Sequence, residues 1–176
     1  MFYYKREKLA TNIATAMVPV LQAVFRSTGR TDAQLFDKSF LSGFLSGSCF
    51  ALAAVFSGQP LSPRDTGDIQ VRVLRKLVGE QWQVVSDYVL KYIKLGDADC
   101  VRGSEAAQGF WAVSYGLIDL DSDSLLRRFR EKAKSVPQYT KDAGLAPPQD
   151  ENEAVASLMM THILEEITEG KAWDAN

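Results

Sequence analysis

The chain has 176 residues, of which 46% are hydrophobic and 24% are charged, and its formal net charge is −2. This composition is typical of a soluble globular protein, and the length suits one domain with a sizeable core. A net charge so close to zero does not favour nucleic acid or an anionic membrane as a partner. The charge is uneven, however, because residues 1–88 carry a net +3 and residues 89–176 a net −5. This asymmetry indicates either contact between the halves or between copies, or simply two solvated faces.

Apolar residues recur every three or four positions over residues 5–25, which predicts an amphipathic helix that ends near Gly29. A second helix is predicted over 32–56, followed by a Pro- and Gly-rich linker over 57–67. The strongest helical pattern covers residues 69–95 and predicts either one long helix or two with a bend at Gly79. Gly96 is expected to end this pattern.

Residues 97–103 are interpreted as a turn, with Ser104 capping a helix that continues to about residue 118. A short basic helix is predicted over 125–134, a long loop over 138–150, and a last helix from Asp150 to about Glu169. No segment shows the alternation of a strand. We therefore predict an all-α fold: a compact single-domain bundle of six or seven helices over residues 1–170, around a central apolar helix at about 39–56, with a tail over 171–176.

The segment 39–63 contains no charged side chain. Small residues at four-residue spacing form one ridge on a helix, which predicts close helix packing at Ser39, Gly43, Gly47 and Ala51. The apolar part, residues 40–56, reaches only the lower edge of a membrane-spanning length and is diluted by glycine and serine. We interpret it as a buried core helix and do not expect a membrane as a partner.

Two cysteines, Cys49 and Cys100, are too few for the disulfide scaffold of a secreted domain and form no Cys-x-x-Cys pair. We interpret both as reduced hydrophobic side chains, which places the protein in the cytoplasm. The N-terminal basic residues precede an apolar stretch, as in a secretion signal, but Thr11 and Asn12 interrupt that stretch. We expect an ordinary helix there.

The series Asp119, Asp121 and Asp123 matches the start of a calcium-binding loop, but Ser124 stands where glycine is required and Arg130 where a glutamate ligand is required. His162 is the single histidine, so any metal site or triad that needs two is excluded. Phosphate-binding glycine loops are absent. We predict no catalytic residue, no metal and no cofactor, and lean against an enzyme.

Two further residue sets are candidates for binding. An apolar pocket is one interpretation of five aromatic residues, although such residues more often fill a core: Phe40, Phe44, Trp82, Phe110 and Trp111. The basic helix supplies a candidate contact surface: Arg127, Arg128, Arg130, Lys132 and Lys134. An acidic last helix is an internal partner for these cations, so nucleic acid is not favoured.

The sequence predicts a small soluble interaction or regulatory protein without catalytic activity. Its partner is either another protein or a second copy of the same chain. The alternative is a helical bundle that binds an apolar or aromatic small molecule.

Overall fold

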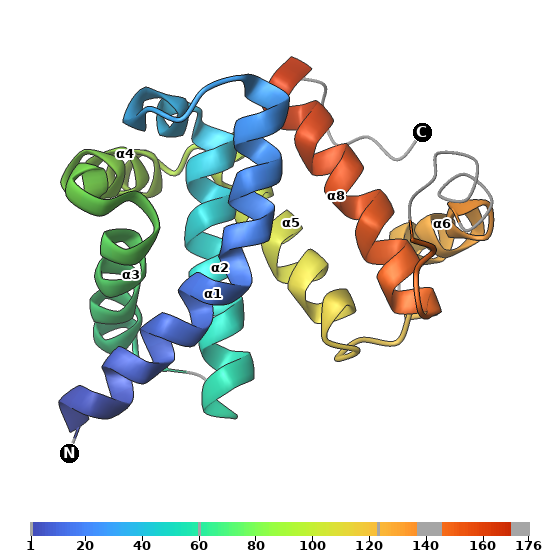
Figure 1. The fold of residues 1–176 in the computed structure, drawn as a ribbon, viewed down its shortest axis with the longest axis horizontal. Coiled ribbons are helices and arrows are strands. Elements are labelled where there is room, and N and C mark those ends of the chain that lie inside the picture. The colour runs from blue at the N-terminus through green and yellow to red at the C-terminus, as the bar shows by residue number, and fades with distance from the viewer. Residues whose placement is uncertain (1, 60, 123, 137–145, 170–176) are drawn as a thin grey trace. The chain divides into compact units, whose positions relative to one another are not determined.

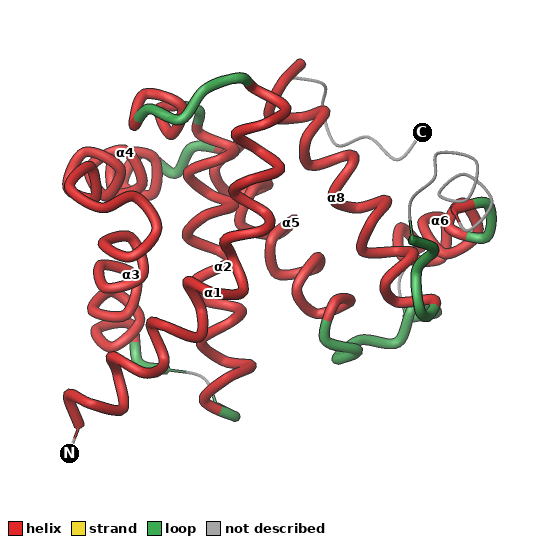
Figure 2. The backbone as a smooth tube through the Cα atoms, in the orientation of Figure 1, coloured by secondary structure: helices red, strands yellow, loops and turns green. Residues whose placement is uncertain are grey.

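The computed structural model describes residues 2–59, 61–122, 124–136 and 146–169, and every regular element in them is helical (Figure 2). The predicted all-α fold is confirmed. The chain divides into two compact units, Met1–Gln108 and Gly109–Asn176, and each is described by itself. The number of independent domains stays a prediction. The predicted tail over 171–176 and most of the predicted loop over 138–150 lie outside the described residues.

The first unit is a helical bundle that contains the apolar segment (Figure 1). Its elements are α1 (Phe2–Thr28), a 3-10 helix η1 (Ala33–Asp37), α2 (Ser39–Ser57), α3 (Pro63–Val78), a 3-10 turn η2 (Gly79–Gln81), α4 (Trp82–Leu95) and the first part of α5 (Ala98–Ser114). Helix α2 packs against α1, α3, α4 and η1. Most of its residues are buried, whereas α1 and α3 each bury one face.

Local capping explains most helix ends in this unit. Ser62 precedes α3, and its Oγ accepts a hydrogen bond from the Asp65 backbone N–H at 3.2 Å, which satisfies one of the free donors at a helix start. Helices α2 and α4 end at Gly58 and Gly96, whose φ angles of 72° and 61° lie in the left-handed region that favours glycine. Gly79, with φ of 56°, interrupts the long pattern over 69–95. Two helices therefore stand where one or two were predicted.

Two predicted boundaries were wrong. Residues 97–103 are not a turn, because α5 begins at Ala98 and Ser104 lies inside the helix. Asp97 is the cap, since its Oδ1 accepts hydrogen bonds from the backbone N–H groups of Asp99 and Cys100 at 3.0 Å each. The helix predicted from residue 32 is likewise divided, because Lys38 is extended between η1 and α2.

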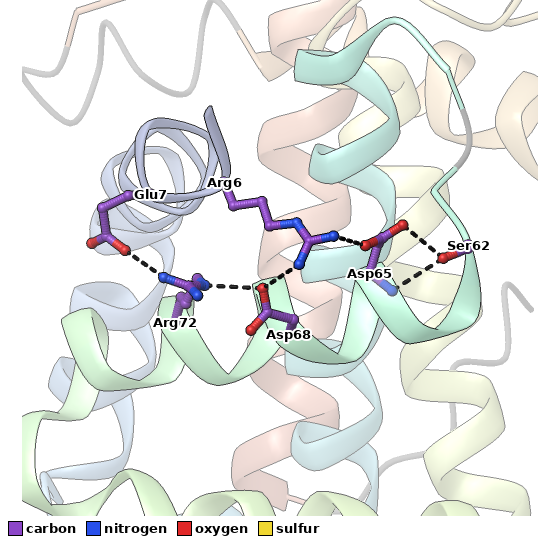
Figure 3. Close-up of polar contacts among 6 residues, drawn as sticks. All are labelled: Arg6, Glu7, Ser62, Asp65, Asp68 and Arg72. Atoms are coloured by element: carbon purple, nitrogen blue, oxygen red, sulfur yellow. Dashed lines mark hydrogen bonds and ion pairs between the residues drawn. The ribbon is translucent and has the colours of Figure 1, made fainter. Parts of the chain in front are cut away.

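A network of matched charges joins α1 to α3 (Figure 3). The Arg6 guanidinium contacts the carboxylates of Asp65 and, at 3.3 Å, Asp68. Arg72 contacts Asp68 at 3.1 Å and Glu7 at 3.0 Å, and Lys76 contacts Glu7 at 2.6 Å. Hydrogen bonds from these cations hold the pKa of Glu7 and of Asp68 below their ordinary values. Three cations thus neutralise three carboxylates, so this network ties two helices together.

The second unit contains the end of α5, helix α6 (Ser124–Ala133) and helix α8 (Glu151–Glu169). Helix α6 packs on α8, and Phe129 and Ile163 are among the buried residues on these helices. Asp150 and Glu153 cap α8 reciprocally: Asp150 Oδ1 accepts from the Glu153 N–H at 2.8 Å, and Glu153 Oε2 accepts from the Gln149 N–H at 2.5 Å.

Two helical segments, Lys5–Thr28 and Ser39–Ser57, are long and apolar enough to cross a membrane by length and composition alone. Core helices of soluble proteins pass the same test, and 61% of the second window is buried within the protein. The exposed side of α1 carries polar residues, among them Lys8, Thr15, Gln22 and Arg26.

Candidate functional site: the α4–α5 groove

The small-residue ridge of α2 lies against the backbone of α5. A Cβ atom added at Gly43 would lie 2.8 Å from the Cys100 Cα, and one added at Gly47 would lie 2.5 Å from the Ser104 carbonyl oxygen. Real Cβ atoms essentially never approach other atoms more closely than 3.0 Å. Only glycine therefore fits at these two positions. Ser39 and Ala51, at the two ends of the ridge, are partly exposed.

The contact is reciprocal, because α5 supplies its own glycine. A Cβ atom at Gly103 would lie 2.9 Å from both the Phe40 carbonyl carbon and the Phe44 amide nitrogen. Backbone thus meets backbone on both helices, an approach that favours Cα–H···O contacts. Gly103 was predicted to lie in a turn, so its contact with α2 was not expected from the sequence. Its signal was a second small-residue pair at four-residue spacing, Gly103 and the fully buried Ala107.

A groove of about 340 Å³ opens beside this helix contact, where α2, the end of α4 and α5 meet. We call it the α4–α5 groove. Its lining comprises Ser46 from α2, four residues around the end of α4 and five residues of α5: Tyr92, Ile93, Gly96, Asp97, Cys100, Val101, Ser104, Glu105 and Gln108. The close approach of α2 and α5 fixes the floor, because the same turns of α5 that touch Gly43 and Gly47 also line the groove.

Large apolar side chains are exposed along the groove and the adjoining end of α4. Ile93 is 51% exposed and Val101 49% exposed, and both line the groove. Leu90 and Leu95, on the same helix as Ile93, are also exposed, at 47% and 69%. Four large aliphatic side chains are thus exposed within residues 90–101. Such a concentration is typical of a contact surface.

The charged side chains in the lining are carboxylates. Asp97 is occupied as the cap of α5, and the hydrogen bond from the Cys100 N–H lowers its pKa. Glu105 is exposed and forms no ion pair with any residue that the structure describes. Burial, together with the nearby Asp97 carboxylate, raises the pKa of the Cys100 thiol. Cys100 is therefore a protonated, apolar part of the floor rather than a nucleophile.

The five aromatic residues of the predicted pocket belong to both units, three to the first and two to the second. Phe40 and Phe44 are buried within α2, and Trp82 lies at the start of α4, where the Arg75 guanidinium is 4.4 Å from its ring centroid. Phe110 and Trp111 belong to the second unit and form an edge-to-face pair at 4.8 Å. None of the five lines the α4–α5 groove.

The basic helix is partly used for internal contacts in the second unit. Arg130 donates to Glu151, at the start of α8, and to Asp121, both at 2.7 Å. These two carboxylates raise the pKa of Arg130. Lys134 pairs with Glu131 at 2.6 Å, while three other cations of the predicted surface are exposed on α6: Arg127, Arg128 and Lys132. The predicted contact surface is therefore reduced by its internal ion pairs.

Residues considered for metal binding have structural roles in the described part of the chain. Asp119 Oδ1 accepts from the Asp121 N–H at 2.9 Å, as a turn residue does, and Asp121 is bound to Arg130. His162 Nδ1 lies 3.1 Å from Glu165, and its ring packs edge-on against Phe129 at 5.3 Å. No group of three or more potential ligands occurs among the described residues.

A second pocket, of about 580 Å³, lies in the second unit between the end of α5 and the start of α8. Its acidic lining residues, Asp150 and Glu153, are the two that cap α8. Their carboxylates are therefore already committed to backbone N–H groups. The more strongly apolar α4–α5 groove is the better candidate site.

Comparison of the chain with family models, with curated proteins and with solved structures finds no match.

Proposed function

We propose that this chain is a small, non-catalytic interaction protein of the cytoplasm that binds a protein partner through the α4–α5 groove and the adjoining end of α4. The observation that carries the proposal is the pair of exposed aliphatic residues in the groove, Ile93 and Val101, with exposed Leu90 three residues before Ile93 on the same helix face. Removing aliphatic surface from water is favourable by roughly 25 cal/mol per Å², so exposed aliphatic side chains that lie together favour burial against a partner.

The residues in the groove support binding rather than catalysis. Its thiol is held protonated, its Asp97 caps a helix, and its serines and glutamine have no histidine or lysine beside them in the lining. Histidine and lysine, two common activators of a nucleophile, do not line this groove. Two buried thiols are also consistent with a reducing compartment.

The test compares partners bound by the wild-type chain, by Ile93→Asp and by Val84→Asp. Val84 is a matched control because it is an α4 residue that is 46% exposed and does not line the groove. We expect a partner that binds the wild-type chain and Val84→Asp but does not bind Ile93→Asp. The same partner, once purified, should bind the wild-type chain again. A partner retained equally by all three chains contradicts the proposal. So does substrate turnover that substitution of one polar residue abolishes.

A second candidate function rests on Trp111. Its indole is buried, yet its Nε1–H has no hydrogen-bond acceptor among the residues that the structure describes. A buried donor left unpaired costs about 1–3 kcal/mol, which a ligand with an acceptor oxygen would recover. An aromatic small molecule would also meet the neighbouring rings of Phe110 and Tyr115. Native mass spectrometry of the purified chain and of Trp111→Phe tests this function: a ligand bound to the first and lost from the second supports it.

A further inference from the structure

We propose that the α4–α5 groove recognises a basic amphipathic segment of its protein partner. An aliphatic side chain of that segment packs between Ile93 and Val101, and a flanking lysine or arginine pairs with Glu105. This inference rests on the proposed function and adds the chemistry of the segment that is bound.

The apolar half of the recognition comes from the shape of the groove. Ile93 on α4 and Val101 on α5 are each about half exposed, and the largely buried Cys100 lies in the floor with them. An aliphatic side chain placed there would be covered from two helices. The volume of about 340 Å³ is at the lower end of the range, roughly 300–1,000 Å³, that small-molecule sites occupy. It suits one or two anchoring side chains of a peptide.

The apolar surface also extends past the groove, which favours a peptide over a small molecule. Leu90 lies on α4 beyond the lining, is 47% exposed and precedes Ile93 by three residues, so the two side chains share a helix face. An amphipathic helix places apolar side chains at positions i, i+3, i+4 and i+7, so one segment can fill the groove and also cover Leu90.

The polar half comes from charge. Both charged lining residues are acidic, and Glu105 is the one whose carboxylate has no ion pair in the described structure. Nearby cations are occupied elsewhere: Lys91 pairs with Asp37 at 3.0 Å, and Arg102 pairs with Asp99 at 2.9 Å. Lys94 is exposed on α4 but does not line the groove. A cation on the partner therefore meets an available carboxylate at the groove.

A second copy of this chain is the less suitable occupant. In a two-fold symmetric dimer the same patch meets itself. Two α4–α5 grooves in contact would bring their acidic linings together, including both copies of Glu105. Repulsion between like charges across an interface works against such a dimer.

The experiment uses three synthetic 14-residue peptides with the same leucines at i, i+3, i+4 and i+7. They differ only in their flanking residues, which are lysine, glutamine or glutamate. Fluorescence anisotropy of each labelled peptide measures its affinity for the full chain. We expect the lysine peptide to bind about three- to tenfold more tightly than the glutamate peptide, because an exposed ion pair is weak and the comparison replaces attraction to Glu105 by repulsion. Glu105→Gln should narrow this ratio towards one, and Glu105→Arg should invert it.

Controls locate the binding and exclude unfolding. Val101→Asp should weaken the lysine peptide at least tenfold, whereas Val84→Asp should leave it within about twofold, with helical circular dichroism unchanged in every variant. Three outcomes overturn the proposal: no binding, equal binding of the three peptides, or lysine-peptide binding that survives Val101→Asp. A dimer in sedimentation that Val101→Asp dissociates also overturns it, because the groove would then be a self-association surface.

Failure here is distinguishable from failure of the proposed function. If a purified partner depends on Ile93 while the peptides show no charge preference, the groove binds proteins but not by this chemistry. If no partner depends on Ile93, the groove is not an interaction surface.

Discussion

The backbone contact between α2 and α5 makes Gly103→Ala a sharp test of how this fold is held together. The added methyl group would lie 2.9 Å from the Phe40 carbonyl carbon and from the Phe44 amide nitrogen, and closer still to the Phe40 carbonyl oxygen. These are backbone atoms of a helix, so no side chain can rotate away to make room. The two helices must separate instead.

The expected magnitude follows from two opposing effects. Forcing a methyl group into a packed contact costs about 1–3 kcal/mol, and the rigid backbone on both sides puts this site at the upper end. Alanine in place of glycine inside a helix returns about 1 kcal/mol through helix propensity. We therefore expect a net loss of about 2 kcal/mol in the free energy of unfolding for Gly103→Ala, and a similar loss for Gly43→Ala.

Gly67→Ala is the matched control. Gly67 lies inside α3, and a Cβ atom there would have no neighbour within 4 Å. Only the propensity effect then remains, so this substitution should stabilise the chain by about 0.4–1 kcal/mol. Chemical denaturation followed by circular dichroism measures all three variants. The reasoning is refuted if Gly103→Ala raises the unfolding midpoint as Gly67→Ala does.

Two more predictions concern ionisation. Because Glu7 and Asp68 have pKa values lowered in the folded state, their contribution to stability is present at pH 7 and is lost as the pH falls below the ordinary carboxyl pKa values of 4.5 and 3.8 and through the lowered ones. Arg72→Gln should flatten this acid dependence in pH-resolved unfolding, and an unchanged dependence would contradict the network's role. Burial raises the pKa of Cys49 to about 12 and also raises that of Cys100. An aromatic disulfide reagent at pH 8 should therefore react slowly with Cys100, which lines the groove, and with Cys49 only after unfolding. Labelling of Cys49 that is faster than labelling of Cys100 would be inconsistent with this burial.

The all-α fold was predictable because each amphipathic helix repeats its apolar residues every three or four positions. The long pattern over 69–95 predicted either one helix or two with a bend at Gly79, and the structure has two. The start of α5 is set by a capping residue and could not be predicted from periodicity. Asp97 starts α5 through hydrogen bonds to two backbone N–H groups, and an aspartate that caps a helix has the same sequence context as one in a turn.

Glycine was the hardest residue to interpret. Gly96 ends a helix with a positive φ, whereas Gly103, seven residues later, lies within one and admits the backbone of α2. Both occur in the same short segment, and a single sequence does not distinguish a conformational role from a steric one. The partner glycines Gly43 and Gly47 are easier, because they stand inside a long apolar run that has no other break.

The groove itself was not predictable from the sequence. Ile93 and Val101 belong to different helices, and an isoleucine within a strong helical pattern is usually buried. The exposure of Ile93 depends on which face of α4 the neighbouring elements cover, and that is a tertiary feature. Long-range ion pairs such as Arg6 with Asp68 escaped prediction for the same reason.

An amide-resolved nuclear magnetic resonance titration tests the groove most directly. The ¹⁵N-labelled chain is titrated with the lysine-flanked peptide, and chemical-shift changes are mapped onto the sequence. The account predicts saturable changes concentrated at Ile93, Val101 and Glu105, and their loss in Val101→Asp. Changes centred instead on the pocket near Tyr115 and Glu153, or no changes at all, would contradict it.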